Sequence, residues 1–394
     1  MMLKKSIIIE SFNTKSGEFS MKKIFVLGGG YANLAFLKSL DDEVFSLAEF
    51  TLISKHNYHY ESVLLHEVAS GSKKNIVFNF DEILPKQIRF IKDNVLEIKN
   101  NEVIGQGGKY AYDILIIGLG FSSDDFGILG VREYAFCITN YDDSILLFES
   151  IQRKLKSKSK LDIAICGGGF SGVELISSLA ENFKDQLNLV CIEAMPNILP
   201  MFDEESIDNA LHYLSNFNIK FLTKSKILEV KNNAILIENN GIESLINADI
   251  VVWTAGVKGN VVIENSKFFP SKRSKIEVNN YLQPLNNESM NNIFIIGDCA
   301  ALKDSNNRFH PPTAQIAIAQ GEYLARVMKY KLENKPLKEE FKYQSKGTIC
   351  SLGNKYAIGN IGNKRIKGIC ASILKKFIEF KWEYKLKGFR ALFH

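Results

Sequence analysis

Two stretches of the chain join apolar runs through a glycine-rich turn. In the clearer one, the apolar run 161–166 leads into the sequence GGGFSG at 167–172. Apolar residues then recur at three- and four-residue spacing, and a second apolar run at 187–192 ends in Glu193. A change from continuous apolar runs to a helical period marks strands around a helix. The pattern therefore predicts strand, tight turn, helix, strand and a terminal acid.

Each part of this unit suits a dinucleotide. Gly167 allows the sharp turn, Gly169 lets the backbone approach a pyrophosphate, and Gly172 lets the helix pack closely on the strand. The helix N-terminus offers free N–H groups and a positive dipole end. Glu193 lies 21 positions after Gly172, where a carboxylate accepts both ribose hydroxyls and repels a 2′-phosphate. The unit favours NAD(H) binding over a merely structural glycine turn.

A second turn of this kind lies near the N-terminus. The apolar run 23–27 precedes Gly28-Gly29-Gly30-Tyr31-Ala32-Asn33, in which Asn33 replaces the third glycine. The next apolar run, 50–53, ends in Ser54-Lys55 rather than in an acid. This unit keeps a phosphate loop but lacks the ribose carboxylate, although Ser54 and Lys55 can hydrogen-bond a ribose. The alternative is an ordinary β-α-β corner.

The remaining pattern indicates an α/β protein with two Rossmann-like dinucleotide-binding domains. We expect strands at 88–98, 112–120, 220–223, 227–231, 234–238, 249–253 and 292–296, and helices at 142–158, 203–217 and from Pro311-Pro312 to Met328. The strands from 220 to 238 suggest a meander, and prolines suit a first helical turn. The predicted divisions are a disordered extension at 1–20, a first domain at 21–118 and 259–330, a second at 119–258, and a C-terminal region at 331–394.

Composition narrows the function classes. The 394 residues suit two or three domains. A net charge of only +5 gives no nucleic-acid signature. Six scattered cysteines without a C-x-x-C pair indicate a reduced, intracellular protein and predict no metal site. No apolar run reaches the roughly 18 residues of a membrane span, and the N-terminus lacks the apolar core of a signal peptide.

In this order the elements resemble the two-dinucleotide-binding-domain flavoproteins. Within them the chain is most similar to type II NADH dehydrogenase, the NADH:quinone oxidoreductase that does not pump protons, from about Lys22 to about Phe380. The segments that carry the resemblance are 58–61 (YHYE), 65–67 (LHE), 167–174, 253–256 (WTAG), 296–298 (IGD), 314–320 (AQIAIAQ) and 346–353 (KGTICSLG). Two positions depart from the family pattern: Asn33, and Gln320, which comes one residue later than the family's second glutamine.

The resemblance implies non-covalent FAD in the first domain and NADH in the second. The FAD contacts that it implies are Gly28, Gly29, Gly30, Tyr31, Ala32, Ser54, Lys55, Val95, Gly120, Asp298, Gln315, Ile316, Ala317 and Lys376. The NADH contacts are Gly167, Gly169, Phe170, Ser171, Gly172, Glu193, Ala255 and Gly256. The positive end of the helix after Pro312 would face the flavin. The acceptor that the resemblance implies is a membrane quinone, either menaquinone or ubiquinone.

Three polar residues are candidates for the chemistry. The family's glutamate at the position of Glu174 sits near the nicotinamide and is implicated in catalysis or proton delivery. The alternative is a surface acid that the helix dipole stabilises. Gln315 and Gln320 would contact the quinone by resemblance, but residues five apart lie about 140° around a helix and do not share a face.

Two other functions stay open from the sequence alone. A sulfide:quinone oxidoreductase has the same fold and uses separated cysteines, for which Cys137 and Cys350 are candidates. That enzyme has no need of the NADH pocket that Glu193 indicates. A flavin-binding redox sensor with low turnover is the second alternative, to which Asn33 and Ser54 give some weight.

The C-terminus predicts an amphipathic helix within 372–394. Ile373, Phe377, Phe380 and Tyr384 form one stripe, which Leu374, Ile378, Trp382 and Phe389 widen. Aromatic residues and excess basic charge favour an anionic lipid surface over the alternative, a helix of a soluble core. We expect peripheral attachment to the cytoplasmic face of the cell membrane, with Lys375 or Lys376 near the flavin or the quinone entrance. A homodimer is left open.

Overall fold

The computed structural model describes residues 21–285 and 290–393, so the extension expected at 1–20 lies outside the described residues. Its first sheet has five parallel strands in the order β21-β9-β1-β2-β5. Their bounds are β1 (Lys22–Leu27), β2 (Ala48–Ser54), β5 (Ile88–Lys92), β9 (Ile114–Ile117) and β21 (Ile293–Ile295). Helix α1 (Tyr31–Lys38) connects β1 to β2. The glycine turn predicted at 28–30 lies between β1 and this helix.

The second sheet has the same architecture as the first. Its five parallel strands follow the order β11-β18-β12-β13-β14. Their bounds are β11 (Ala135–Cys137), β12 (Leu161–Cys166), β13 (Leu187–Ile192), β14 (Ile219–Leu222) and β18 (Ile250–Trp253), and helix α6 (Phe170–Phe183) connects β12 to β13. The strands read as continuous apolar runs because a parallel sheet is covered on both faces. The predicted class, α/β with two Rossmann-like units, is confirmed.

Two short strands carry the chain between the sheets. The chain leaves the first sheet through β10 (Phe121–Ser123) and returns through β19 (Val257–Gly259), and the two pair antiparallel. The Ser122 hydroxyl donates to the Gly259 carbonyl at 2.8 Å. The second sheet is thus inserted between β9 and β21 of the first. The domain boundaries at 118/119 and 258/259 stay predictions, and they fall beside this pair.

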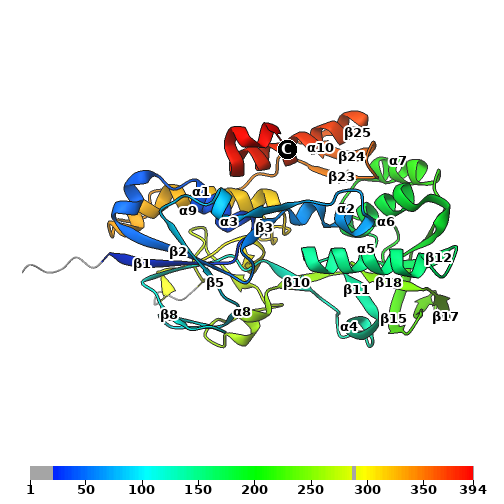
Figure 1. The fold of residues 1–394 in the computed structure, drawn as a ribbon, viewed down its shortest axis with the longest axis horizontal. Helices are drawn as coiled ribbons and strands as arrows, with labels where there is room; N and C mark the ends of the chain where they lie inside the picture. The colour runs from blue at the N-terminus through cyan, green and yellow to red at the C-terminus, as the bar shows by residue number, and fades with distance from the viewer. Residues whose placement is uncertain (1–20, 286–289, 394) are drawn as a thin grey trace, which may run out of the picture.

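Smaller elements surround the two sheets (Figure 1). The accessory strands are β3 (Tyr58–Tyr60), β4 (Val77–Asn79), β6 (Val95–Lys99), β7 (Glu102–Gly105), β8 (Lys109–Ala111), β15 (Ser225–Lys231), β16 (Ala234–Asn239), β17 (Ile242–Asn247), β20 (Ile276–Glu277) and β22 (Ala300–Ala301). The other helices before the C-terminal region are α2 (Leu65–Ser70), α3 (Phe80–Ile83), α4 (Val131–Tyr134), α5 (Tyr141–Leu155), α7 (Glu204–Leu214), α8 (Val261–Asn265) and α9 (Ala314–Leu332), with 3₁₀ turns at 42–46, 62–64, 184–186 and 297–299.

Two strand predictions need correction. The strand expected at 88–98 is two strands, β5 and β6, because the chain turns at Asp93. The Asp93 carboxylate accepts hydrogen bonds from the Asn94 and Gly107 amides and from the Tyr110 hydroxyl, which hold this bend. The strand expected at 220–223 is β14 of the second parallel sheet, so the predicted meander is formed by β15, β16 and β17 instead.

Helix α9 begins later than its prolines suggest. Thr313 is its N-cap, and the Thr313 hydroxyl accepts a hydrogen bond from the Ile316 amide at 3.3 Å. A hydroxyl at this position satisfies one of the free N–H groups of the first turn. Helix α9 packs beside α1 (Figure 1), so closely that a Cβ on Gly321 would lie 2.1 Å from the Ala32 carbonyl oxygen.

The C-terminal region packs across both halves (Figure 1). It contains the antiparallel strands β23 (Thr348–Ser351), β24 (Ala357–Ile361) and β25 (Lys364–Gly368), helix α10 (Ile369–Lys387) and a 3₁₀ turn at 388–393. Trp382 and Leu386 of α10 belong to the buried core of the first unit. Trp382, expected on the lipid-facing side, therefore points inward, whereas Ile373 and Phe377 are each 61% exposed.

Candidate functional site

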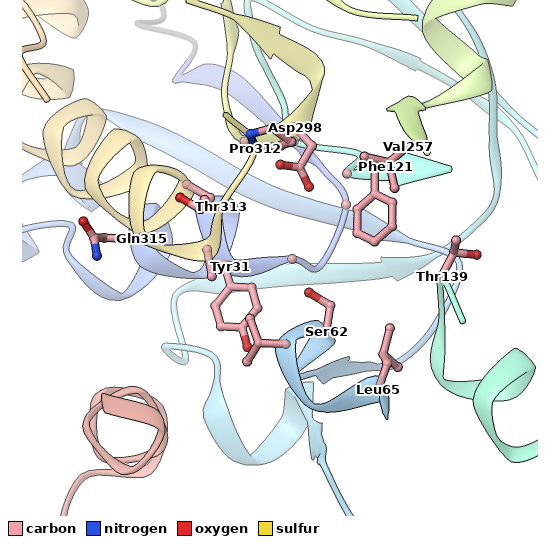
Figure 2. A pocket seen from close by; sticks show the side chains of 18 of the residues that line it. Tyr31, Ser62, Leu65, Phe121, Thr139, Val257, Asp298, Pro312, Thr313 and Gln315 are labelled. Atoms are coloured by element: carbon pink, nitrogen blue, oxygen red, sulfur yellow. The ribbon is translucent and has the colours of Figure 1, made fainter. Parts of the chain in front are cut away.

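A cavity of about 1280 Å³ lies between the two dinucleotide units. Its lining includes Gly28–Tyr31 from the first glycine loop and Phe170, Ser171 and Glu174 from the start of α6. Figure 2 shows Tyr31, Ser62, Phe121 and Asp298 arranged around this space. The cavity thus extends from the first predicted phosphate loop to the first turn of α6, which follows the glycines of the second.

The first loop is shaped to hold an anion. Gly28 has a φ of +98°, and a Cβ there would lie 2.5 Å from the Gly118 carbonyl oxygen, so the position requires glycine. Gly30 is the N-cap of α1, makes no side-chain cap and has open space where a Cβ would point. The first N–H groups of α1 therefore face the cavity without a side-chain acceptor, as a bound pyrophosphate requires.

Asn33 fits the place of the missing third glycine. Its side chain is fully buried, and its amide donates to the carbonyls of Leu27 at 2.6 Å and Gly28 at 2.7 Å. A Cβ on Gly118 would lie 2.7 Å from this amide, so the glycine that directly follows the neighbouring strand β9 makes room for it. Helix α1 forms with this substitution, and side-chain hydrogen bonds replace the close backbone packing.

The second loop uses glycine in the usual way. A Cβ on Gly172 would lie 1.9 Å from the Gly167 carbonyl oxygen, so α6 packs directly on the end of β12. The Glu193 carboxylate accepts from the Gly168 amide at 2.6 Å and from the Met195 amide at 2.8 Å. These contacts hold the carboxylate beside the loop, at the end of β13, where the sequence predicted it.

The two glutamines of α9 occupy different environments. Gln315 lines the cavity, and its side-chain oxygen accepts from the Tyr343 hydroxyl at 2.7 Å and from the Lys346 amide at 2.8 Å. Gln320 is buried and accepts from the Gly297 amide at 2.7 Å. Gln320 therefore holds the 297–299 turn and is not among the lining residues of the large cavity, contrary to the quinone contact expected for it.

Asp298 points into the cavity from the turn that Gln320 holds (Figure 2). Burial raises the pKa of this carboxyl above its usual value, although Lys275 opposes the shift. The N-terminus of α9 faces the same space through Thr313, Ala314 and Ala317. A polar group with hydrogen-bond donors would satisfy Asp298, and a group that gains negative charge would be stabilised by the end of α9.

Glu174 is at the centre of a buried charged cluster. Its carboxylate pairs with the Lys375 ammonium of α10, accepts from the Ser351 amide at 3.0 Å and lies 3.7 Å from His66 Nδ1. Burial raises the pKa of Glu174, but Lys375, His66 and the Ser351 amide outweigh it, so the net shift is downward. Burial lowers the pKa of Lys375, and the facing Glu174 more than offsets it. Glu174 is therefore not the surface acid that the sequence left open but the acidic partner of a buried ion pair.

The wall opposite the glycine loops comes from the C-terminal region. It includes Tyr343 to Ile349 before and within β23, and Leu374, Lys375, Ile378 and Glu379 of α10. Sequence reasoning missed Glu379 and Tyr343, although the resemblance at 346–353 indicated that this region matters. Lys376, expected near FAD, is exposed and donates to the Asn354 carbonyl at 3.1 Å. Its neighbour Lys375 reaches the cavity instead.

The predicted contact residues divide into two groups. Those that line the cavity are Gly28, Gly29, Gly30, Tyr31, Ser54, Lys55, Val95, Gly120, Asp298, Gln315, Ala317, Phe170, Ser171, Gly256 and Glu174. Those outside its lining are Ala32, Ile316, Lys376, Gly167, Gly169, Gly172, Glu193, Ala255 and Gln320. Several of the second group shape the loops from behind, as Gly167 and Gly172 do.

A hydrogen-bond chain ties α10 to the first glycine loop. Trp382 Nε1 donates to His59 Nε2 at 3.1 Å, and His59 Nδ1 lies 3.0 Å from the Gly29 carbonyl oxygen. Because indole only donates, His59 Nε2 is the acceptor and Nδ1 carries the hydrogen that Gly29 receives. Burial lowers the pKa of His59 to about 4, which keeps this ring neutral.

The fold has two Rossmann-like units, and residues of both line one cavity, as expected of a protein with two dinucleotide-binding units. In agreement, the family model described as pyridine nucleotide-disulphide oxidoreductase matches residues 22–321. All six cysteines are free, and five of them are buried or half-buried.

The relatives define the family more narrowly. The type II NADH:quinone oxidoreductase of Staphylococcus saprophyticus is 36% identical over 93% of this chain and 96% of its own, and that of Staphylococcus aureus is 34% identical over the same shares. The chain belongs to the family of type II NADH:quinone oxidoreductases.

Solved structures share the fold. NDH2 from Plasmodium falciparum, solved in complex with NADH, has a TM-score of 0.84 at 21% identity and covers 93% of this chain and 96% of its own. The sulfide:quinone oxidoreductase of Aquifex aeolicus has a TM-score of 0.78 at 20% identity and covers 93% of this chain and 91% of its own.

The protein is therefore a flavoprotein that oxidises NADH and reduces quinone. This confirms the main functional prediction over the sulfide-oxidising and redox-sensing alternatives. Cys350, a candidate sulfur carrier in the first of these, is fully buried, and burial raises the pKa of its thiol well above the usual value.

Proposed function

We propose that non-covalent FAD occupies the first unit, NADH the second, and quinone the part of the cavity beside α10. One observation carries this proposal: the first glycine loop, the start of α6 behind the second glycine loop, and α10 all line the same cavity. The first unit corresponds to residues 21–118 with 259–330, the second to 119–258, and residues 331–394 cover the quinone side. Flavin, when bound, accepts a hydride from NADH and passes two electrons to quinone.

The first loop supports FAD specifically. Its free N–H groups at α1 suit the pyrophosphate, and Ser54 and Lys55 line the cavity where β2 ends, beside the expected ribose. Asp298 and the N-terminus of α9 lie farther along, where a ribitol and the flavin ring would lie. The pyrophosphate, the ribose, the ribitol and the flavin ring each have polar groups of the protein beside them, so the residues present fit FAD.

Glu174 is proposed to orient the reacting rings. It lies on the first turns of α6, next to Phe170 and Ser171 in the cavity lining, on the route from the NADH loop to the flavin. Paired with Lys375, the carboxylate is ionised and held in one place. Hydride transfer needs two rings held at contact distance rather than an acid or base, so the role we propose for Glu174 is positioning.

Quinone is proposed to enter between α9 and α10. Leu374 and Ile378 provide an apolar wall, and Gln315 provides a polar group at the N-terminus of α9. The quinone contact inferred for Gln315 from the family is therefore kept, and that for Gln320 is dropped. Whether the acceptor is menaquinone or ubiquinone is decided by assay with each.

The proposed arrangement is tested on the purified protein by its absorbance. Heat release and chromatography should identify FAD, anaerobic NADH should bleach the flavin bands, and a soluble quinone should restore them. Protein that carries FMN, or flavin that NADH leaves oxidised, would contradict the assignment.

Glu193 should set the choice of donor. Glu193→Ala is expected to raise the KM for NADH by about tenfold to a hundredfold, because hydrogen bonds to a charged group contribute about 1.5–3 kcal/mol. The substitution should also narrow the preference of the enzyme for NADH over NADPH. The measurement is kcat/KM with both donors, and Glu193→Gln, which keeps an acceptor for the Gly168 amide, is the matched control. Equal efficiency with NADH and NADPH in the unmodified protein would refute the role.

We also propose that the exposed face of α10 binds an anionic lipid surface on the cytoplasmic side. Ile369, Ile373 and Phe377 are exposed together on this helix, and Phe389 follows it. Among the described residues, no helix is long and apolar enough to cross a bilayer. Exposed apolar side chains beside lysines support a helix that lies in the interface plane. A homodimer stays a hypothesis.

Point substitutions test the lipid face better than truncation does. Removing the chain from Ser372 would also remove the cavity wall and Trp382. Phe377→Glu is expected to weaken binding to anionic vesicles by about tenfold or more, since burying a phenylalanine contributes about 1.5–3 kcal/mol. Co-sedimentation measures this effect, and Ile242→Glu, at an exposed position on β17, is the control. Equal vesicle binding by both variants would show that α10 is not the anchor.

A further inference from the structure

A seam of charged side chains runs between α10 and the segment 61–73. On α10, Lys375, Glu379 and Glu383 follow one another at four-residue spacing and so share one face. The residues that face them from the other segment are Glu61, His66, Glu67 and Lys73, as the ion pairs and mutual electrostatic effects show. The seam is unusual because the core around it is apolar.

The two ends of the seam lie in different surroundings. At the outer end, Lys73 pairs with Glu383 at 3.7 Å, and both side chains are partly exposed. At the inner end, Glu379 and the Glu174–Lys375 pair line the cavity. The seam therefore connects solvent with the proposed quinone site.

Glu61 lies inside the seam without a hydrogen-bond partner. It is 1% exposed, and neither of its carboxyl oxygens has a partner among the described residues. The Tyr31 hydroxyl is also buried and has no hydrogen-bond partner within the described part of the chain, and it comes from the cavity side (Figure 2). A buried carboxylate without a partner is too costly to be ionised, so Glu61 holds a proton.

The pKa shifts of Glu61 and Glu379 agree with the burial of these two carboxyl groups in the seam. Burial, with Glu383 and Glu379 nearby and Lys73 opposing, raises the pKa of Glu61 to about 8. Burial also raises the pKa of Glu379 to about 7, against the opposing effect of Lys375. The charged groups around the two carboxyls are Glu67, Lys73, Glu174, Lys375 and Glu383.

The reaction requires such a donor. NADH gives up one hydride, which contains two electrons and one proton, while quinone becomes quinol with two new O–H bonds. One further proton must therefore come from water in each turnover. Glu174 is ionised in its pair with Lys375 and has no proton to give.

We propose that Glu379 donates this proton to quinone, and that Glu61 returns a proton to Glu379 from solvent at the Lys73–Glu383 end. In each turnover one O–H bond of Glu379 breaks, one O–H bond of the quinol forms, and water restores the carboxyl. Glu379 is the catalytic residue, whereas Glu61 acts only through it. The inference rests on the proposed quinone position.

The experiment compares two electron acceptors. Ferricyanide accepts electrons without protons, and a short soluble quinone needs both. Glu379→Gln is expected to lower kcat with quinone by about 100-fold or more, the usual contribution of a general acid, and to leave ferricyanide reduction unchanged. Glu61→Gln should lower quinone turnover less, because Glu61 acts only through Glu379. Rates are expressed per bound flavin, and Glu322→Gln, which removes a carboxylate that pairs with Lys385 on α10 away from the seam, is the control.

Glutamine replaces a protonated glutamate without changing charge or shape, so a merely structural role would survive these changes. In the unmodified protein, quinone turnover should fall as pH rises through 7 to 8, because the neutral carboxyls are lost, while ferricyanide turnover should not. Glu61→Asp should recover part of the quinone rate.

Equal losses with both acceptors, or unchanged quinone turnover in both Gln variants, would overturn the proposal. If a Gln variant lost its flavin, the two pH profiles of the unmodified protein would decide alone: parallel profiles would overturn the proposal. An unmodified protein that bleaches with NADH but fails to reduce quinone would instead refute the proposed quinone site.

Discussion

Glu174→Gln is expected to lose both turnover and about 3 kcal/mol of stability, because breaking one side of a buried ion pair leaves an uncompensated charge. The Lys375 ammonium is largely enclosed, and Glu174 is its ion-pair partner. The Ser351 amide would also exchange a charged acceptor for a neutral one. Urea unfolding midpoints and NADH turnover per bound flavin measure the two effects.

A double substitution separates stability from catalysis. Glu174→Gln with Lys375→Met removes both charges, and replacing a buried pair by neutral groups is often neutral or stabilising. The unfolding midpoint should therefore recover while turnover stays low. If the single variant unfolds at the same urea concentration as the unmodified protein, the pair is not the buried contact described above. If the double variant regains turnover, Glu174 does not position the reacting rings.

Trp382→Ala should release the bound flavin. Truncating a buried tryptophan costs about 3–5 kcal/mol, and Trp382 packs on Tyr31 and His59 with ring centroids 4.9 Å and 5.7 Å away. The loss would loosen α10 and the His59–Gly29 contact at the phosphate loop together. Flavin retained after gel filtration, and the Kd for added FAD by fluorescence, measure the effect.

Trp382→Phe isolates the hydrogen bond. Phenylalanine keeps an aromatic ring but leaves His59 Nε2 without its donor, and a buried unsatisfied group costs about 1–3 kcal/mol. We expect the Kd for FAD to rise by about tenfold, within this energy range, with the fold retained. The same Kd in Trp382→Phe and in the unmodified protein would mean that the chain from Trp382 to Gly29 does not support the loop.

The two glycine loops could be predicted because their requirements are local. Gly167 and Gly172 are needed by the turn and by its contact with α6, and these contacts lie within a few residues of each other in the chain. Glu193 follows from the same unit. Asn33 was harder to interpret, because its compensation comes from Gly118, 85 positions away, and one sequence does not reveal that pairing.

The cavity wall could not be predicted because it depends on how α10 docks. The helical period predicted an apolar face and a polar face, but it could not tell which side chains of either face meet protein. Trp382 therefore appeared lipid-facing although it is buried. Of the two lysines considered for the entrance, Lys376 was assigned to the FAD contacts, whereas Lys375 is the one that lines the cavity. Glu61 belongs to the segment 58–61 that carries the family resemblance, but its burial could not be predicted, since an acid in a sequence carries no information about its surroundings.

The insertion of one sheet within the other fixes the order in which the two can be completed during synthesis. The second sheet has all of its strands once residue 253 is made, whereas the first waits for β21 at 293–295. The first sheet thus begins first and is completed last. Its last strand pairs with residues far apart from it in the chain, and contacts of this kind form slowly. Helix α10 emerges later still, so the cavity gains its last wall only after both sheets exist.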